Sequence, residues 1–259
     1  MGANVGQVGR AGDCHDQSMS EHLRVETAHG VRTITIDRPE KRNAMTAAMR
    51  SELRELFADA DADDSVAVVI LTGTDPAFSA GVDLGELRAR PVNDEPSEPR
   101  GPIVDPASVI RESTTPVIAA VNGVCVTGAL EVALSCHVIV ASERATFADT
   151  HAKVGLVPAW GMSVLLPEAV GRRKALELSI TGAFIDAAEA LRIGLANQVV
   201  PHGELLPTAQ AMADAIRAAD PVSVRTLLAL SRYGAGLPRL EGLRLERATM
   251  ETWRAERRP

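Results

Sequence analysis

Hydrophobic and polar positions form short blocks along the first part of the chain. Residues 23–28 and 31–37 ("LRVETA" and "VRTITID") are runs of strand-forming residues separated by "HG", which predicts a β-hairpin. A polar loop over 38–46 follows. In residues 47–63 the apolar side chains recur every three or four positions, which predicts an amphipathic helix.

Three later blocks are strongly apolar and have the length of buried strands. They lie at 66–73 ("VAVVILTG"), 116–123 ("PVIAAVNG") and 137–148 ("HVIVASERATFA"). Helical patterns lie between and after these blocks, at 128–136, 164–180, 186–194 and 208–219. Strands that alternate with helices predict an α/β fold, in which helices cover a parallel sheet.

Three segments fall outside this alternation. Residues 1–18 are rich in Gly, Asp, Gln and Ser and lack the apolar stretch of a signal peptide, which predicts a flexible tail and leaves Met19 as an alternative start. Residues 88–106 contain five prolines and several charges, which predicts a mobile surface loop or lid, hypothetically near the active site. Beyond residue 200 the pattern is helical to the chain end, which predicts a smaller helical region.

Composition narrows the class of protein. The 259 residues, nearly half of them apolar, can bury a full core, and the net charge of -7 argues against a nucleic-acid-binding surface. Cys14, Cys125 and Cys136 are too few and too scattered for a disulfide framework or a metal site, which favours a reducing cytoplasm. No apolar run reaches the length of a membrane span. We therefore expect a cytoplasmic protein with no metal, membrane or nucleic-acid partner.

The first candidate for chemistry is the stretch "LTGTDPAFSAGVDL" at 71–84. A buried strand ends here in small residues before a predicted helix, and Gly73, Ala80 and Gly81 leave the backbone accessible. Backbone N–H groups at the start of a helix can bind an anion or a carbonyl oxygen. An ordinary strand-to-helix turn explains this stretch equally well when it is taken alone.

The second candidate is "VNGVCVTGALEVALSC" at 121–136. Gly123 ends a strand, and Gly128 precedes a helix in which Glu131 is the one charge among apolar residues. A carboxylate on a buried helix is desolvated, which raises its pKa and suits it to proton transfer. In the alternative interpretation, Glu131 only complements the dipole of the helix in its first turn.

The third candidate is "FADTHAKVGLVPAWGMS" at 147–163. Asp149 could cap a helix that begins at Thr150, and His151 would then be an early helical residue of undetermined direction. If the backbone is extended instead, Asp149 and His151 point to the same side and the carboxylate can orient the imidazole. By themselves, lone histidines are more often structural than catalytic.

Together, the first two stretches offer backbone donors at two strand ends for one carbonyl oxygen. Such a pair polarises the carbonyl and stabilises the enolate or oxyanion formed from it. Glu131 lies one helical turn after the second donor, which places it within reach of the neighbouring carbons. The constellation predicts proton chemistry beside a polarised carbonyl, and no nucleophilic triad, Walker loop, dinucleotide fingerprint or metal motif competes with it.

The motifs in order along residues 20–235 resemble the enoyl-CoA hydratase/isomerase, or crotonase, superfamily. They include "RPEKRNAM", "AFSAGVDL", "PVIAAVNGVCVTGALEVALSCHVIVASERATFA" and "GLVPAWG" followed by "GLANQVV". The resemblance implies an α/β fold built as a spiral of ββα units (19–200) with a C-terminal helical trimerisation region (201–259). It also implies a homotrimer or a dimer of trimers.

The resemblance further implies an acyl-CoA thioester as substrate, with coenzyme A as part of the substrate and no separate cofactor. The two oxyanion donors then fall at Ala80 and Gly128. The loop from Lys41 through Arg42 to Asn43, and the backbone near Asp83 and Leu84, match the regions that hold the CoA nucleotide. The last helix, which in relatives helps to cover CoA, is in doubt because the chain ends soon after "LRLERATMETW".

Two departures from the family pattern bear on the reaction. Hydratases of the family use two glutamates: Glu131 matches the first, while His151 occupies the position of the second. Trp160 stands where relatives carry smaller residues, and it either walls the acyl pocket or is a bulky core residue. A neutral imidazole can accept or donate a proton near pH 7, so we predict a 2-enoyl-CoA hydratase that uses Glu131 and His151. The alternatives are isomerisation, thioester hydrolysis, decarboxylation or dehalogenation of an acyl-CoA, and a non-catalytic acyl-CoA binder.

Overall fold

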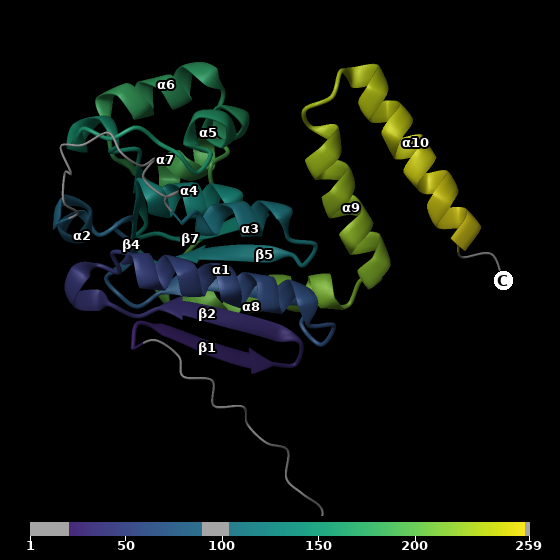
Figure 1. The fold of residues 1–259 in the computed structure, drawn as a ribbon, viewed down its shortest axis with the longest axis horizontal. Coiled ribbons are helices and arrows are strands. Elements are labelled where there is room, and N and C mark those ends of the chain that lie inside the picture. Colours follow the sequence, from purple (N-terminus) through teal and green to yellow (C-terminus); the bar gives the residue numbers. More distant parts are fainter. Residues whose placement is uncertain (1–20, 90–103, 257–259) are drawn as a thin grey trace, which may run out of the picture.

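A six-stranded sheet forms the centre of the molecule (Figure 1) in the computed structural model, which describes residues 21–89 and 104–256. Its strand order is β1-β2-β3-β5-β7-β10. The strands are β1 (Leu23–Ala28), β2 (Val31–Ile36), β3 (Val68–Gly73), β5 (Val117–Val121), β7 (Val138–Ser142) and β10 (Gln198–Val200). The β1–β2 pair is antiparallel and every other pair in this sheet is parallel, so the predicted hairpin and parallel sheet are confirmed.

A second, four-stranded sheet has the order β4-β6-β8-β9. It consists of β4 (Ala77–Ser79), β6 (Val124–Val126), β8 (Thr146–Ala148) and β9 (Ile185–Asp186). The pairs β3–β4, β5–β6 and β7–β8 each place one strand in either sheet, which is the predicted spiral of ββα units. The prediction of one strand over 137–148 is wrong, because the chain turns between β7 and β8 to change sheets.

Helices fill the remaining connections. The α-helices are α1 (Ala47–Ala62), α2 (Leu84–Ala89), α3 (Pro106–Glu112), α4 (Gly128–Ser135), α5 (Met162–Val170), α6 (Arg172–Thr181), α7 (Ala187–Arg192), α8 (Leu205–Arg217), α9 (Pro221–Gly234) and α10 (Arg239–Glu256). Short 3-10 helices are η1 (Pro39–Lys41), η2 (Ala152–Val154) and η3 (His202–Glu204). The helix predicted over 164–180 is interrupted at Gly171, whose φ of 80° lies in a region that interrupts a right-handed helix.

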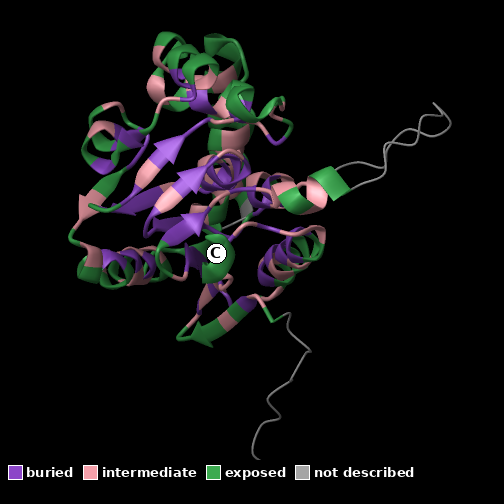
Figure 2. Ribbon diagram, turned by 90° about the vertical axis from the view of Figure 1, so that its left-hand side faces the viewer, coloured by how far each residue is buried: buried purple, intermediate pink, exposed green. Residues whose placement is uncertain are grey.

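The central strands are buried on both faces, which explains their unbroken apolar sequences (Figure 2). Because side chains alternate along a strand, Val68 and Ile70 belong to the cluster with Leu205, Ala209 and Ala213 of α8. Their neighbours Val69 and Leu71 belong to the larger cluster that includes α1, α3 and α4. The sheet therefore lies between α8 on one face and, on the other, the cluster that includes α1, α3 and α4.

The predicted helical region over 201–259 behaves in two ways. Helix α8 packs on the sheet, whereas α9 and α10 pair with each other and extend beside the body (Figure 1). No helix within 21–89 or 104–256 combines the length and the apolar character needed to cross a membrane. The tail predicted over 1–18, and all but the ends of the loop predicted over 88–106, lie outside the described residues.

Candidate active site

Glu131 lies in the first turn of α4 and is 2 % exposed. Its Oε1 accepts hydrogen bonds from the backbone N–H groups of Trp160, at 2.7 Å, and Met162, at 3.2 Å. Trp160 precedes α5 and Met162 is its first residue, so the Glu131 carboxylate connects α4 with the start of α5. One oxygen is thereby fixed, and Oε2 is left to face the centre of the site.

His151 lies between Glu131 and a second carboxylate, Asp149. Its Nδ1 is 2.7 Å from Asp149 Oδ1, and its Nε2 is 3.5 Å from Glu131 Oε2. All three side chains are buried. The helix considered at Thr150 begins instead at Ala152, as η2, and the Asp149 carboxylate accepts from both the backbone and the ring of His151. The backbone at His151 is helical and not extended as that interpretation assumed, yet the Asp149 carboxylate still faces the imidazole; we call Asp149, His151 and Glu131 the carboxylate–imidazole chain.

The two carboxylates control the charge of the ring. Burial by itself would lower the pKa of His151, but the hydrogen bond with Asp149 and the contacts with the negative charges of Glu131 and Asp149 raise it to about 9. Burial acts to raise the pKa of Asp149, and hydrogen bonds from His151 and Ser179 lower it overall. The raised pKa favours the imidazolium form of His151 near pH 7, in place of the neutral imidazole considered from the sequence.

Of the two predicted oxyanion donors, Gly128 and Ala80, only Gly128 has an N–H at the start of a helix. The N–H of Gly128 is the first of α4, and a Cβ placed on Gly81 would lie 3.2 Å from the Gly128 nitrogen, so the two loops touch. The Ala80 prediction is corrected, because its N–H donates to the carbonyl of Arg42 at 2.9 Å. Within the described part of the chain, the N–H of Val82, two residues later, has no acceptor.

Trp160 is 3 % exposed and packs directly against the start of α4. A Cβ on Gly128 would lie 2.8 Å from its ring, so glycine is required at this close approach. Its carbonyl accepts a hydrogen bond from Arg111 at 2.6 Å, while its N–H donates to Glu131. Trp160 is thus a buried part of the site's frame, with its backbone holding Glu131.

The residues predicted to hold the CoA nucleotide differ in availability. Lys41 and Arg42 are exposed at the end of η1, whereas Asn43 is fully buried. The Asn43 side chain accepts from Arg38 N–H and donates to the carbonyls of Thr74 and Ala77, so it secures a turn and leaves no group for a substrate.

The Asp83 side chain is also committed within the protein. It pairs with Arg38 at 2.6 Å and caps α2 by accepting from the N–H groups of Gly85 and Glu86. Its own N–H donates to the carbonyl of Met45. Leu84, half-buried, begins α2. The Asn43 and Asp83 side chains are therefore engaged within the protein, and binding of CoA by the loop 41–43 and by the backbone near Asp83 and Leu84 stays a prediction.

A cavity of about 350 Å³ adjoins the carboxylate–imidazole chain. Asp149 and His151 lie in its wall, together with mainly apolar side chains of the loop after η2 and of α5 and α6, including Leu156, Met162 and Leu176. Arg172, at the start of α6, also lines it. The cavity has the size and lining expected for an apolar group presented to His151.

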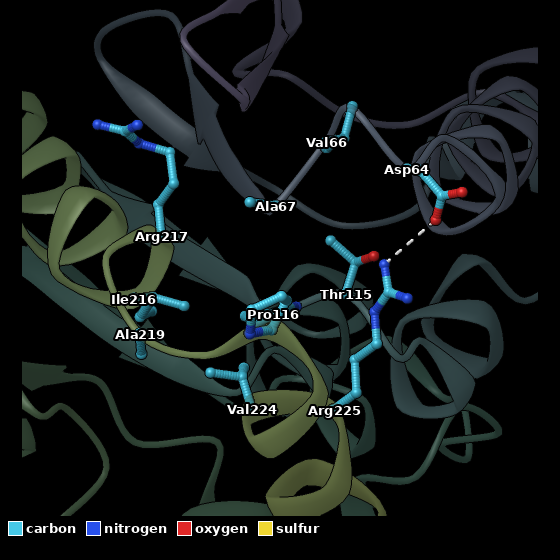
Figure 3. A pocket seen from close by; sticks show the side chains of 11 residues that line it. Asp64, Val66, Ala67, Thr115, Pro116, Ile216, Arg217, Ala219, Val224 and Arg225 are labelled. Atoms are coloured by element: carbon cyan, nitrogen blue, oxygen red, sulfur yellow. Dashed lines mark ion pairs between the residues drawn. The ribbon is translucent and has the colours of Figure 1, made fainter. Parts of the chain in front are cut away.

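A smaller cavity of about 60 Å³ lies at the other end of the strands (Figure 3). It is lined by residues that precede β3 and β5, such as Val66 and Thr115, and by the α8–α9 junction. An ion pair of 3.6 Å between Arg225 and Asp64 crosses its edge. Glu131 follows the opposite, carboxyl end of β5, so this cavity is separate from the candidate site.

Two supporting residues were not found by sequence reasoning. Arg111 ties α3 to the Trp160 carbonyl and to Ser135, and Ser179 of α6 binds Asp149. Neither lies in a glycine-bearing motif or beside another candidate in the sequence. The N–H of Val82 was also missed as an oxyanion donor, although Val82 directly follows Gly81 in the stretch already selected.

The chain matches the family model described as enoyl-CoA hydratase/isomerase over residues 26–256. It is 39 % identical, over 78 % of this chain and 75 % of the relative, to a protein of Arabidopsis thaliana named probable enoyl-CoA hydratase 1, peroxisomal. A crystal structure of enoyl-CoA hydratase from Mycobacterium tuberculosis matches 91 % of this chain and all of that chain, with 45 % identity and a TM-score of 0.74.

A further solved structure with a different stated activity is also similar. A monofunctional enoyl-CoA isomerase of M. smegmatis matches 86 % of this chain and 98 % of that chain, with 34 % identity and a TM-score of 0.72. The family model spans most of the chain, and the two solved structures share its fold. The chain therefore belongs to the enoyl-CoA hydratase/isomerase family, with the crotonase fold.

Proposed function

We propose that this protein adds water to the double bond of a 2-enoyl-CoA thioester. The observation that carries the proposal is the buried pair of Glu131 and His151, whose reactive atoms face each other at 3.5 Å beside the start of α4. A carboxylate and an imidazolium supply one base and one acid, which are the two groups that hydration requires. Relatives of the chain named as enoyl-CoA hydratases support this choice.

The thioester carbonyl would be bound by the backbone N–H groups of Val82 and Gly128. The Gly128 N–H begins a helix, and helix starts attract developing negative charge. The Val82 N–H is free of acceptors among the described residues, and the contact between Gly81 and Gly128 brings the two segments together. Two donors at this place stabilise the enolate that forms during the addition.

Each proton in the reaction then has a defined source and destination. The Glu131 carboxylate removes a proton from water as the oxygen bonds to C3 of the enoyl group. The electron pair of the double bond moves toward the thioester, and the imidazolium of His151 donates its Nε2 proton to C2. Glu131 finally returns its proton to His151, so that one water has been added and both residues recover their starting states.

The remaining parts of the proposal concern binding and assembly. The exposed cations Lys41 and Arg42 bind phosphates of CoA, and the reaction requires no cofactor apart from the CoA of the substrate. Exposed apolar side chains on α9 and α10, such as Leu227 and Leu240, form contacts between copies in a homotrimer or a dimer of trimers. The protein acts in the cytoplasm, in fatty acid metabolism.

A turnover screen tests the proposed reaction. The full chain is mixed with 2-enoyl-CoA thioesters of short, medium and long acyl chains, and hydration is followed as loss of the ultraviolet absorbance of the conjugated thioester. We expect 3-hydroxyacyl-CoA as product with at least one chain length.

Parallel samples receive 3-enoyl-CoA, and binding of each thioester is measured by calorimetry. Conversion of 3-enoyl-CoA to 2-enoyl-CoA without hydration would overturn the proposal and indicate an isomerase, the activity named for the M. smegmatis relative. Binding with no turnover of either substrate would instead identify an acyl-CoA-binding protein.

A further inference from the structure

The two nitrogens of the His151 ring lie on opposite edges, and each faces a different carboxylate. Nδ1 lies 2.7 Å from Asp149 Oδ1, which is the length of a strong, charge-assisted hydrogen bond. Nε2 lies 3.5 Å from Glu131 Oε2, which is longer than an ordinary hydrogen bond. One edge of the ring is therefore fastened, while the other has room to exchange a proton.

Asp149 is itself held firmly in place. It is 1 % exposed, and its carboxylate accepts from His151 N–H at 3.2 Å and from the Ser179 hydroxyl of α6. The turn around it is tied to the start of α4, because Thr127 N–H donates to the Ala148 carbonyl and the hydroxyls of Thr127 and Thr150 lie 2.7 Å apart. A buried carboxylate with several donors has little freedom to move, which suits it to orienting another group.

We infer that Asp149 is a positioning residue for proton transfer: its carboxylate holds the Nδ1 proton of His151 and aims Nε2 at the reacting carbon and Glu131. The inference rests on the proposed function, in which His151 is the acid. Asp149 keeps its own bonds throughout, so no atom or electron is gained or lost there. An aspartate that merely stabilised the turn would require only the backbone contact to His151 N–H.

The charges around the ring agree with this role. Asp149 and Glu131 face the imidazole directly, and Arg172 of α6 lines the same cavity. The ammonium of Lys153, on η2, lies over the ring of Phe184 at 5.8 Å. The two adjacent carboxylates prevail over burial, and the pKa of His151 is raised to about 9.

The Asp149→Asn variant of the full chain tests the inference. Asparagine keeps the shape and an acceptor oxygen but loses the charge. We expect kcat for hydration to fall at least about 10- to 100-fold, the range for carboxylates that orient metal-ligating imidazoles, with little change in KM. The alkaline fall in activity should move down by about 1 to 3 pH units, because an opposite charge beside His151 is lost.

The same shift is measured without substrate by nuclear magnetic resonance of the histidine rings, with His151 assigned by the His151→Gln variant. Asp186→Asn is the matched control, since the Asp186 carboxylate is exposed and caps α7 by accepting from Glu189 N–H. It should leave both the activity and the His151 titration unchanged. If Asp149→Asn does not fold, Asp149→Ser replaces it, because serine also removes the charge and retains an acceptor.

Two results would separate the inference from the proposed function. Lower activity with an unmoved His151 titration would overturn the positioning role, because a structural defect alone gives that pattern. If the wild-type protein hydrates no enoyl-CoA, the proposed function fails. The His151 titration in Asp149→Asn would still show whether Asp149 controls the ring.

Discussion

His151 is buried and His137 is half-buried, and their pKa values are shifted in opposite directions. Burial lowers the pKa of both, and at His137 the charge of Arg232 adds to this, so its pKa falls to about 4 despite the opposing charge of Asp61. At His151 the two carboxylates reverse the effect of burial, and its pKa rises to about 9. Burial is the main cause that keeps His137 neutral, and at His151 the two carboxylates together reverse the effect of burial.

The hydrogen bonds at the two rings follow the same division. Nδ1 of His137 accepts from the N–H of Val117 at 2.9 Å, so that nitrogen carries no proton, and the ring supports the start of β5. Nδ1 of His151 faces the Asp149 carboxylate, which accepts a hydrogen bond from the ring. One histidine is therefore a neutral structural acceptor, and the other is a charged acid beside a cavity.

The largest expected effect comes from removing the carboxylate that faces His151 Nε2. In Glu131→Gln the amide oxygen still accepts from Trp160 and Met162, so the fold is kept while the base is lost. We expect kcat for enoyl-CoA hydration to fall about 10²- to 10⁴-fold, the usual contribution of a general base. The His151 titration should also move to lower pH, and that of His137 should stay where it is.

Glu168→Gln provides the matched control for this substitution. Glu168 is exposed on α5, so its replacement should leave hydration and both histidine titrations at their wild-type values. Wild-type turnover in Glu131→Gln would reject the assignment of Glu131 as the base. An unmoved His151 titration in that variant would show that Asp149 alone sets the charge of the ring.

The second effect is a pH dependence of stability with opposite sign at the two histidines. The pKa of His151 is raised from 6.5 to about 9 in the folded protein, so its stabilisation is fully present below pH 6.5 and fades as the pH rises through 9. The pKa of His137 is lowered to about 4, so its neutral ring favours folding above pH 6.5, and this contribution is lost as the pH falls toward 4.

Chemical denaturation across the pH range measures both contributions. The slope of unfolding free energy against pH reports how many more protons one state binds than the other. In His151→Gln this difference should change by at most about one proton between pH 6.5 and 9. In His137→Gln a change of that size or smaller should occur between pH 6.5 and 4, reduced by solvent screening because the ring is half-buried. Changes in the same pH window for both variants would contradict the comparison.

Local sequence patterns predicted the frame of the molecule well and the contacts of the site less well. The strands β3 and β5 and the start of α4 could be predicted because apolar runs bounded by glycine are local signals. The strands β4, β6 and β8 have three residues each, too short to show a period of two, so the second sheet was missed.

Long-range pairings account for the other errors. Whether the Ala80 N–H is free depends on the Arg42 carbonyl, which is brought to it by a separate loop. The charge of His151 depends on Glu131 from α4, twenty residues earlier in the chain, and sequence spacing does not give the distance between them. Asn43 lies in a loop that was predicted to hold CoA, and its side chain forms hydrogen bonds with three backbone groups that lie close to it only in the folded chain.

The smallest expected effect isolates the cation that distinguishes His137 from His151. Arg232, on α9, donates to the Ser113 carbonyl at 2.5 Å and lowers the pKa of His137 by its charge. In Arg232→Met we expect the His137 titration to rise by less than about one pH unit, because a single half-buried charge is partly screened.

Arg244→Met, which removes an exposed arginine of α10, serves as control. Hydration and the His151 titration should be unchanged in both variants, because α9 supplies no group to the carboxylate–imidazole chain. An unmoved His137 titration in Arg232→Met would mean that burial alone keeps that ring neutral, so the two histidines would then differ only through the carboxylates at His151.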